Sequence, residues 1–229
     1  MTKLNSAQVE AAYERWAPVY DIVFDKALAP GRSALAAAAC DPQAKVLVVG
    51  VGTGLELRFF DSGANLIGID VSEAMLRRAK ERVARSRLSQ VEALCVMDAM
   101  RLGFRDDCFD YVAAPYVMTV VPNPHLVLDE MFRVTKPGGE IVLVNHISAQ
   151  KGVMGAFEVW LAQHSRLLGW RPEFSWETIG GWISATSGAE LVERRRIAPL
   201  GMFTLTRIVK MPEFRSEIGS ASEALSTVP

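Results

Sequence analysis

The chain is short of cysteine, of net charge and of long apolar runs. Its 229 residues include three cysteines, which lack the spacing of a metal site or a disulfide framework. Cys40 and Cys95 lie in apolar sequence, so we expect them in the core. A formal net charge of -1 gives no overall basic character for binding nucleic acid. These absences favour a protein of the reducing cytoplasm that has neither a metal nor a nucleic-acid partner.

Segments for export or membrane insertion are not evident either. No apolar run approaches the roughly 20 residues that a membrane-spanning helix needs. The N-terminus is polar and charged, unlike a cleavable signal. Because 50% of the residues are hydrophobic, a chain of this length can bury the core of one α/β domain.

What the chain does contain is an apolar run that ends in three alternating glycines. The run covers residues 46–49, and the glycines are Gly50, Gly52 and Gly54. Glycine lets the backbone pass close to a ligand where a Cβ atom would collide. A second apolar run, residues 66–69, ends in Asp70, whose carboxylate can accept hydrogen bonds from two ribose hydroxyls. The pattern predicts the front half of a nucleoside-binding α/β site.

Strands and helices are expected to alternate along most of the chain. The expected strands are residues 45–49, 65–69, 91–97, 109–114, 140–145, 188–196 and 202–210, the last two as a hairpin. The expected helices are residues 6–28, 32–40, 53–61, 73–86 and 124–134, with Pro30-Gly31 as a break, Ser72 as an N-cap and residues 135–139 as a turn. This alternation predicts an α/β fold with a mostly parallel, seven-stranded sheet flanked by helices.

Polar and glycine residues follow several of the expected strands. Gly50, Asp70, Asp98, Tyr116 and His146 all come at or just after carboxyl ends. Ligands of open parallel sheets bind at those ends, so we expect one shared cleft. The tryptophan-rich residues 150–183 follow strand five and would lie beside that cleft, where substrate is recognised.

The glycine spacing indicates which nucleoside is bound. A dinucleotide site has the pattern Gly-x-Gly-x-x-Gly, whereas here Leu55 stands at the last position. Residues 46–54, with Gly-Ile-Asp-Val-Ser at residues 68–72, resemble motif I and the acidic loop of class I S-adenosylmethionine-dependent methyltransferases. The fold implied by the resemblance is Rossmann-like.

Shorter blocks point to a subfamily. Residues 13–21, Tyr-Glu-Arg-Trp-Ala-Pro-Val-Tyr-Asp, resemble the opening of methyltransferases that act on quinones and phospholipids. Residues 119–124, Asn145-His146 and Pro30-Gly-Arg32 are most similar to the bacterial phosphatidylethanolamine N-methyltransferases of the soluble, peripheral kind. A quinone C-methyltransferase shares the first blocks and remains the alternative.

The resemblance implies a role for each matching position. The methionine and ribose parts of S-adenosylmethionine would contact the glycine turn, and its ribose hydroxyls would bind Asp70. Its adenine and methyl group would contact the residues that follow strands two to four. The implied cofactor-binding residues are Tyr13, Tyr20, Gly50, Gly52, Thr53, Gly54, Asp70, Val71, Met75, Asp98, Ala99, Met100 and Pro115. From the residues alone, Asp98 could equally cap a helix, Met75 could be core, and Tyr13 and Tyr20 could pack an amphipathic helix.

Methyl transfer from a sulfonium needs alignment and exclusion of water more than acid–base chemistry. An amine acceptor must be neutral, which an apolar site favours, and aromatic faces stabilise the positive charge that develops on it. The catalytic candidates are Tyr20, Tyr116 and His146, the last as proton acceptor or as a structural histidine. The substrate-binding candidates are Arg32, Trp16 and Tyr116; Arg32 would meet a lipid phosphate or the cofactor carboxylate, or be a surface arginine.

The expected activity is methylation of phosphatidylethanolamine through mono- and dimethyl intermediates towards phosphatidylcholine. The alternative is C- or O-methylation of a quinone or another small acceptor. A non-catalytic sensor of S-adenosylmethionine is disfavoured by Tyr116 and the aromatic insertion, and a nicotinamide-dependent dehydrogenase is disfavoured by Leu55.

The expected organisation is one methyltransferase domain over residues 1–210, followed by a flexible tail over residues 211–229. Within the domain, residues 1–40 form a helical cap, and residues 150–185 form an insertion that faces substrate or membrane. The protein is expected in the cytoplasm, peripherally associated with the inner face of the membrane. Contact with phospholipid would come from the cap or from the insertion, and the basic helix 73–86 would add attraction to anionic lipid.

Overall fold

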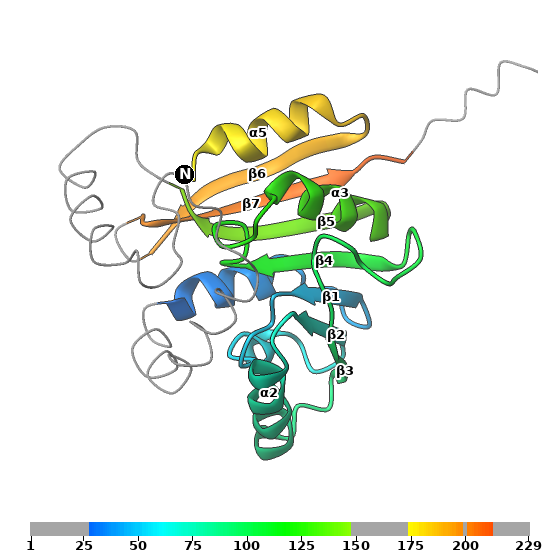
Figure 1. Ribbon diagram of the computed structural model, residues 1–229, viewed down its shortest axis with the longest axis vertical. Helices are drawn as coiled ribbons and strands as arrows, with labels where there is room; N and C mark the ends of the chain where they lie inside the picture. The colour runs from blue at the N-terminus through cyan, green and yellow to red at the C-terminus, as the bar shows by residue number, and fades with distance from the viewer. Residues whose placement is uncertain (1–27, 148–173, 199–200, 213–229) are drawn as a thin grey trace, which may run out of the picture.

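The computed structural model describes residues 28–147, 174–198 and 201–212. A seven-stranded sheet runs through these residues in the order β3-β2-β1-β4-β5-β7-β6 (Figure 1). The strands are β1 Lys45–Val49, β2 Asn65–Asp70, β3 Val91–Val96, β4 Phe109–Pro115, β5 Thr135–His146, β6 Ala189–Ile197 and β7 Phe203–Lys210. The helices are α2 Glu73–Ser86, α3 Pro124–Val134 and α5 Trp176–Ala185, with a helix over residues 28–38 and the short 3-10 helix η1 Leu57–Phe59.

Six strands run in one direction, and β7 alone runs against them. β1 pairs with β2 and β4, β2 with β3, and β4 with β5, each in parallel register. β7 pairs antiparallel with β5 and with β6. The predicted mostly parallel, seven-stranded α/β sheet with a terminal hairpin is therefore confirmed. Parallel neighbours need long crossover connections, whereas β6 and β7 need only a short one.

Each face of the sheet has its own hydrophobic core. Leu47 and Val49 of β1 point to the face covered by α3 and α5. Val46 and Val48 point to the opposite face, with residues of the helix 28–38 and Leu76 of α2. All four β1 side chains are fully buried. Burial on both faces explains why this strand is a continuous apolar run rather than an alternating one.

Local signals place two helices where the sequence predicts them. The Ser72 hydroxyl accepts a hydrogen bond from the Met75 backbone N–H at the start of α2. The Asn123 side chain accepts from the N–H groups of His125 and Leu126 at the start of α3, and Pro124 occupies the first turn. These caps satisfy donors that have no partner within the helix.

Three predicted local features were wrong. Residues 53–61 do not form a regular helix, because Gly54 has a φ of +76° and only η1 follows it. Pro30 and Gly31 lie inside the helix 28–38 rather than breaking the chain. A Cβ atom on Gly31 would lie 2.1 Å from the Tyr116 hydroxyl, so this glycine serves close packing. Residues 135–139, expected as a turn, belong to β5.

The cysteine prediction was also wrong for Cys40, which is exposed. The helix ends at residue 38 and leaves Cys40 beyond its last turn. Cys95 in β3 is half-buried and packs against the core that contains α3.

Two tryptophans of the predicted insertion are part of the domain's packing. Trp182 of α5 is 5% exposed, donates its indole N–H to Asp129 over 2.7 Å and meets the Phe132 ring edge-on. The Trp176 ring lies 3.8 Å from the Arg194 guanidinium. Neither residue forms a free aromatic surface beside the cleft. Trp160 and Trp170 lie outside the described residues.

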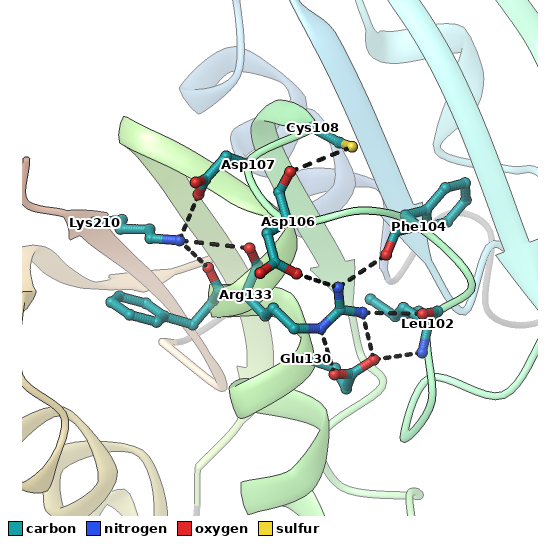
Figure 2. Close-up of polar contacts among 9 residues, drawn as sticks. Leu102, Phe104, Asp106, Asp107, Cys108, Glu130, Arg133 and Lys210 are labelled. Atoms are coloured by element: carbon teal, nitrogen blue, oxygen red, sulfur yellow. Dashed lines mark hydrogen bonds and ion pairs between the residues drawn. The ribbon is translucent and has the colours of Figure 1, made fainter.

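Ion pairs fix the segment between β3 and β4 (Figure 2). The Arg133 guanidinium at the end of α3 pairs with Glu130 and Asp106, each over 2.7 Å, and donates to the carbonyls of Leu102 and Phe104. The Leu102 N–H donates back to Glu130. Asp98 and Met100 belong to the same segment and line the predicted cleft, so the network braces one wall of it.

Candidate active site

A cavity lies at the carboxyl ends of the parallel strands. Its lining comes from the segments that follow β1, β2, β3 and β4 and from the helix 28–38. In this sheet order, β1 and β4 lie side by side although they are far apart in the chain, and such switch points form the binding crevice of doubly wound folds. The predicted residues gathered there are Arg32, Gly50, Gly52, Thr53, Asp70, Val71, Met75, Asp98, Ala99, Met100, Pro115 and Tyr116.

The remaining predicted residues are elsewhere. Gly54 and His146 are described but are not among the lining residues. Tyr13, Trp16 and Tyr20 lie outside the described residues. Sequence reasoning missed Glu56 and the apolar residues Val117, Val120 and Val121, all of which line the cavity.

The three glycines of the turn have different tasks. A Cβ atom on Gly52 would meet nothing within 4 Å, so this backbone borders open space in the cavity. A Cβ atom on Gly50 would lie 2.3 Å from Val117, and one on Gly54 would lie 2.9 Å from Leu57. Gly52 therefore leaves room for a ligand, whereas Gly50 and Gly54 let the protein pack against itself.

Asp70 at the end of β2 joins two loops. Its Oδ2 accepts from the Gly52 N–H over 2.8 Å, and its Oδ1 accepts from the Ser72 N–H over 2.9 Å. Burial raises the pKa of the Asp70 carboxyl, and the backbone N–H groups oppose that rise. Each carboxylate oxygen can accept a second hydrogen bond. The residue is thus placed to hold a diol from the cavity while it fixes the glycine turn.

The segments after β2 and β3 form an apolar wall with one carboxylate. Val71 is 52% exposed, and Met75, Ala99 and Met100 line the same cavity. The Asp98 Oδ1 accepts from the Met100 N–H over 2.8 Å, which turns the chain at this point. An exposed valine beside methionines offers a surface that a planar aromatic ligand would cover.

Tyr116 follows β4 in a strained conformation. Its φ is +62°, which costs a residue other than glycine about 1–2 kcal/mol. The Tyr116 N–H donates to the Val144 carbonyl, its hydroxyl donates to the Leu28 carbonyl over 2.9 Å, and its ring meets Phe203 edge-on. Since the hydroxyl is used to hold the helix 28–38, the ring is the part of Tyr116 that can serve the cavity.

His146 has a structural contact away from the cavity. Its Nδ1 lies 2.8 Å from the Met202 carbonyl, which can only accept, so Nδ1 carries the proton. The side chain is buried against Phe203. The predicted role of His146 as a proton acceptor therefore gains no support from the geometry.

Arg32 and Glu56 form a buried pair on the cavity wall. The Arg32 Nε lies 4.0 Å from the Glu56 Oε2, and both side chains are 5% exposed. Burial raises the pKa of Glu56 to about 7, although Arg32 acts to lower it. Arg32 is thus a cleft residue and not a surface arginine. The signal for Glu56 was its place as the one acid directly after the glycine turn.

A side chain of α2 supports the turn from outside. Arg82 Nε donates to the Thr53 carbonyl over 2.9 Å. Part of the basic face of α2 therefore has a structural role.

Among residues 28–147, 174–198 and 201–212, no group of three His, Cys, Asp or Glu side chains could hold a metal ion.

Comparisons with known proteins agree with this site. The family described as "Methyltransferase domain" matches residues 47–143, which contain the glycine turn, Asp70, Asp98 and Tyr116. A phosphatidylethanolamine N-methyltransferase from Cereibacter sphaeroides is 41% identical over 199 residues, which cover 87% of this chain and 96% of that protein. A demethylmenaquinone methyltransferase from Bacillus cereus (strain B4264) is 44% identical over 77 residues, or 34% of this chain and 32% of that protein.

A solved structure shares the fold. It is a protein from Thermotoga maritima described as an S-adenosylmethionine-dependent methyltransferase, possible histamine N-methyltransferase. The two chains are 20% identical with a TM-score of 0.67, covering 88% of this chain and 99% of that one.

The sheet order, the glycine turn and the acid at the end of β2 define a Rossmann-like enzyme domain that binds a nucleoside. With the identity to a methyltransferase along nearly its whole length, the chain belongs to the class I S-adenosylmethionine-dependent methyltransferases. Its cofactor is S-adenosylmethionine, and the cavity fits that molecule. The backbone at Gly52 leaves open space, the Asp70 carboxylate offers two acceptor oxygens to a ribose, and Val71 forms part of an apolar wall for the adenine.

Proposed function

We propose that this methyltransferase methylates the amine of phosphatidylethanolamine, through the mono- and dimethyl lipids, towards phosphatidylcholine. One observation carries the proposal: the similarity to a phosphatidylethanolamine N-methyltransferase extends over 96% of that relative. Methylation of a quinone is the second candidate, because a demethylmenaquinone methyltransferase is 44% identical over a third of the chain.

The proposed cofactor contacts follow the order of the strands. Asp70 accepts from the ribose hydroxyls, Val71 and Met75 pack on the adenine, and Asp98 with Ala99 and Met100 binds its amino group. Gly50, Gly52 and Thr53 lie against the ribose and methionine part. When bound, S-adenosylmethionine supplies a methyl group already activated on sulfonium, so the chain has to align the acceptor and exclude water.

The acceptor side of the cavity suits a neutral amine. Pro115, Val117, Val120 and Val121 make this wall apolar, and desolvation there favours the uncharged amine that carries the attacking lone pair. The face of the Tyr116 ring stabilises the positive charge that develops on nitrogen. Tyr20 and Trp16, which lie outside the described residues, remain predicted partners of this wall.

The activity assay supplies labelled S-adenosylmethionine with vesicles of phosphatidylethanolamine, its mono- and dimethyl forms, or a demethylated quinone. We expect label in the methylated phospholipids and none in the quinone. Label in the quinone alone would overturn the proposal. Asp61→Asn, at an exposed loop, is a matched control for Asp70→Asn, because each aspartate accepts from a backbone N–H but only Asp70 lines the cavity.

A lipid substrate also requires access to a membrane. No helix among the described residues is long and apolar enough to cross one. We propose reversible attachment to the inner face of the membrane from the cytoplasm, with exposed basic residues of α2 attracted to anionic lipid. Arg77 and Arg85 are exposed members of this face.

Sedimentation with anionic liposomes tests the attachment. Binding is expected at low salt and should weaken as salt screens the charges. The double variant Arg77→Gln/Arg85→Gln should bind less than Arg195→Gln/Arg196→Gln, which removes the same charge from β6 at the far edge of the sheet. If the protein does not bind anionic liposomes at low salt, the proposed membrane attachment is contradicted. The assignment of the cofactor does not depend on this result.

A further inference from the structure

The cavity wall contains a buried carboxylate oxygen that has no hydrogen-bond partner among the residues that the structure describes. Glu56 follows the glycine turn, and its side chain is 5% exposed. Among the described residues, its Oε1 accepts no hydrogen bond. Its Oε2 lies 4.0 Å from Arg32 Nε, which is beyond hydrogen-bond distance.

Such an arrangement is costly unless a ligand completes it. Buried polar atoms are almost always hydrogen-bonded, and a buried charge needs an opposite one. Burial raises the pKa of Glu56 to about 7; Asp70 adds to the rise, while Arg32 and Arg82 oppose it. A cation that reached Oε1 would complete the site and hold the carboxylate in its ionised form.

The position of Glu56 along the cavity indicates which part of the cofactor it meets. Asp98 after β3 and Asp70 at the end of β2 lie at the adenine and ribose ends of the proposed binding mode. The next strands in the sheet are β1 and β4, so the methionine part falls between Gly50 and Tyr116. Glu56 follows β1, and the helix that carries Arg32 packs on Tyr116 through Gly31.

The methionine part of S-adenosylmethionine carries an α-ammonium group and a carboxylate. We propose that Glu56 binds the α-ammonium group through Oε1. Arg32 acts as a positioning residue, because its charge favours the ionised carboxylate and holds it against the cavity wall. The inference concerns the cofactor and stands whichever acceptor is methylated.

Calorimetry with two cofactor fragments tests this contact without turnover. S-adenosylhomocysteine has the amino-acid group, whereas 5′-methylthioadenosine lacks it. Glu56→Gln should weaken binding of S-adenosylhomocysteine roughly 10- to 100-fold, as expected for a lost charge-assisted hydrogen bond. Binding of 5′-methylthioadenosine should stay within about twofold of the wild type. Glu190→Gln, at an exposed position of β6, is the matched control and should change neither affinity.

A second measurement needs no variant. Below the pKa of Glu56 its carboxyl is protonated, so an ammonium must displace that proton in order to bind. The affinity of wild-type protein for S-adenosylhomocysteine should therefore rise between about pH 5.5 and about pH 7.5, while that for 5′-methylthioadenosine stays flat. Equal pH slopes for the two ligands, or equal losses of both on Glu56→Gln, would overturn the proposal and leave Glu56 a structural residue.

Discussion

Replacing Asp70 with asparagine affects both the hydrogen bonds that hold the glycine turn and the proposed contact with the ribose. The carboxylate holds the Gly52 and Ser72 N–H groups with different oxygens. Asparagine offers one carbonyl oxygen and an NH₂ group, so one of these two backbone donors would face another donor. The substitution therefore acts on the loop as well as on the proposed ribose site.

The expected loss of stability follows from these contacts. One part-buried N–H loses its acceptor, at a cost of about 1–3 kcal/mol, and the other loses the assistance of a charge. Burial raises the pKa of Asp70, so removing the buried charge offsets part of that cost. We expect the free energy of unfolding to fall by about 1–3 kcal/mol in total.

The expected loss of affinity is larger. In the proposed binding mode the carboxylate accepts from two ribose hydroxyls, and asparagine keeps at most one acceptor for them. Losing one such bond and weakening the other costs about 2–4 kcal/mol, or roughly 30- to 700-fold in affinity.

Urea unfolding measures the first quantity, and calorimetry with S-adenosylhomocysteine measures the second. Asp61→Asn is the control, since Asp61 accepts from the Gly63 N–H at an exposed turn. Affinity of Asp70→Asn within about threefold of the wild type would refute the ribose role. Unchanged unfolding would refute the role in holding the loop.

The glycine turn and the Arg133 network yield two further predictions. Gly52→Ala should cost about 1 kcal/mol for its positive φ and lower cofactor affinity at least about tenfold, whereas Gly54→Ala, whose Cβ would lie 2.9 Å from Leu57, should mainly lower the melting temperature. Calorimetry and thermal unfolding compare the two, and the reverse order would contradict the division of tasks. Hydrogen bonds from Arg133 lower the pKa of Glu130 in the folded protein. The pair therefore stabilises the fold fully at pH values above the pKa of Glu130 in the unfolded chain, and this stabilisation is lost as pH falls through its lower pKa in the folded protein. Arg133→Met should lower the free energy of unfolding by about 2 kcal/mol near pH 7 and by less near pH 3; an equal loss at both would contradict the coupling.

Features coded by neighbouring residues could be predicted from the sequence. The continuous apolar run of residues 46–49 predicted β1, and Ser72 as an N-cap predicted the start of α2. Asp70 was recognisable because the end of a parallel strand determines where its side chain lies.

Features that depend on distant contacts could not be predicted. Gly31 fits inside a helix because Tyr116 crosses it, and Trp182 is buried because Asp129 and Phe132 of α3 receive it. The role of Glu56 depends on Arg32, which comes from another segment of the chain and lies beside it in the folded protein. None of these pairings leaves a trace in local spacing.

Lipid analysis of cells tests the proposed acceptor most directly. The chain would be expressed in a bacterium that makes phosphatidylethanolamine but no phosphatidylcholine, and lipid extracts would be resolved by mass spectrometry. The proposed function predicts mono- and dimethylated phosphatidylethanolamine together with phosphatidylcholine in cells with the wild-type chain, and much less with Asp70→Asn. A membrane that contains only unmethylated phosphatidylethanolamine, beside a newly methylated quinone pool, would contradict it.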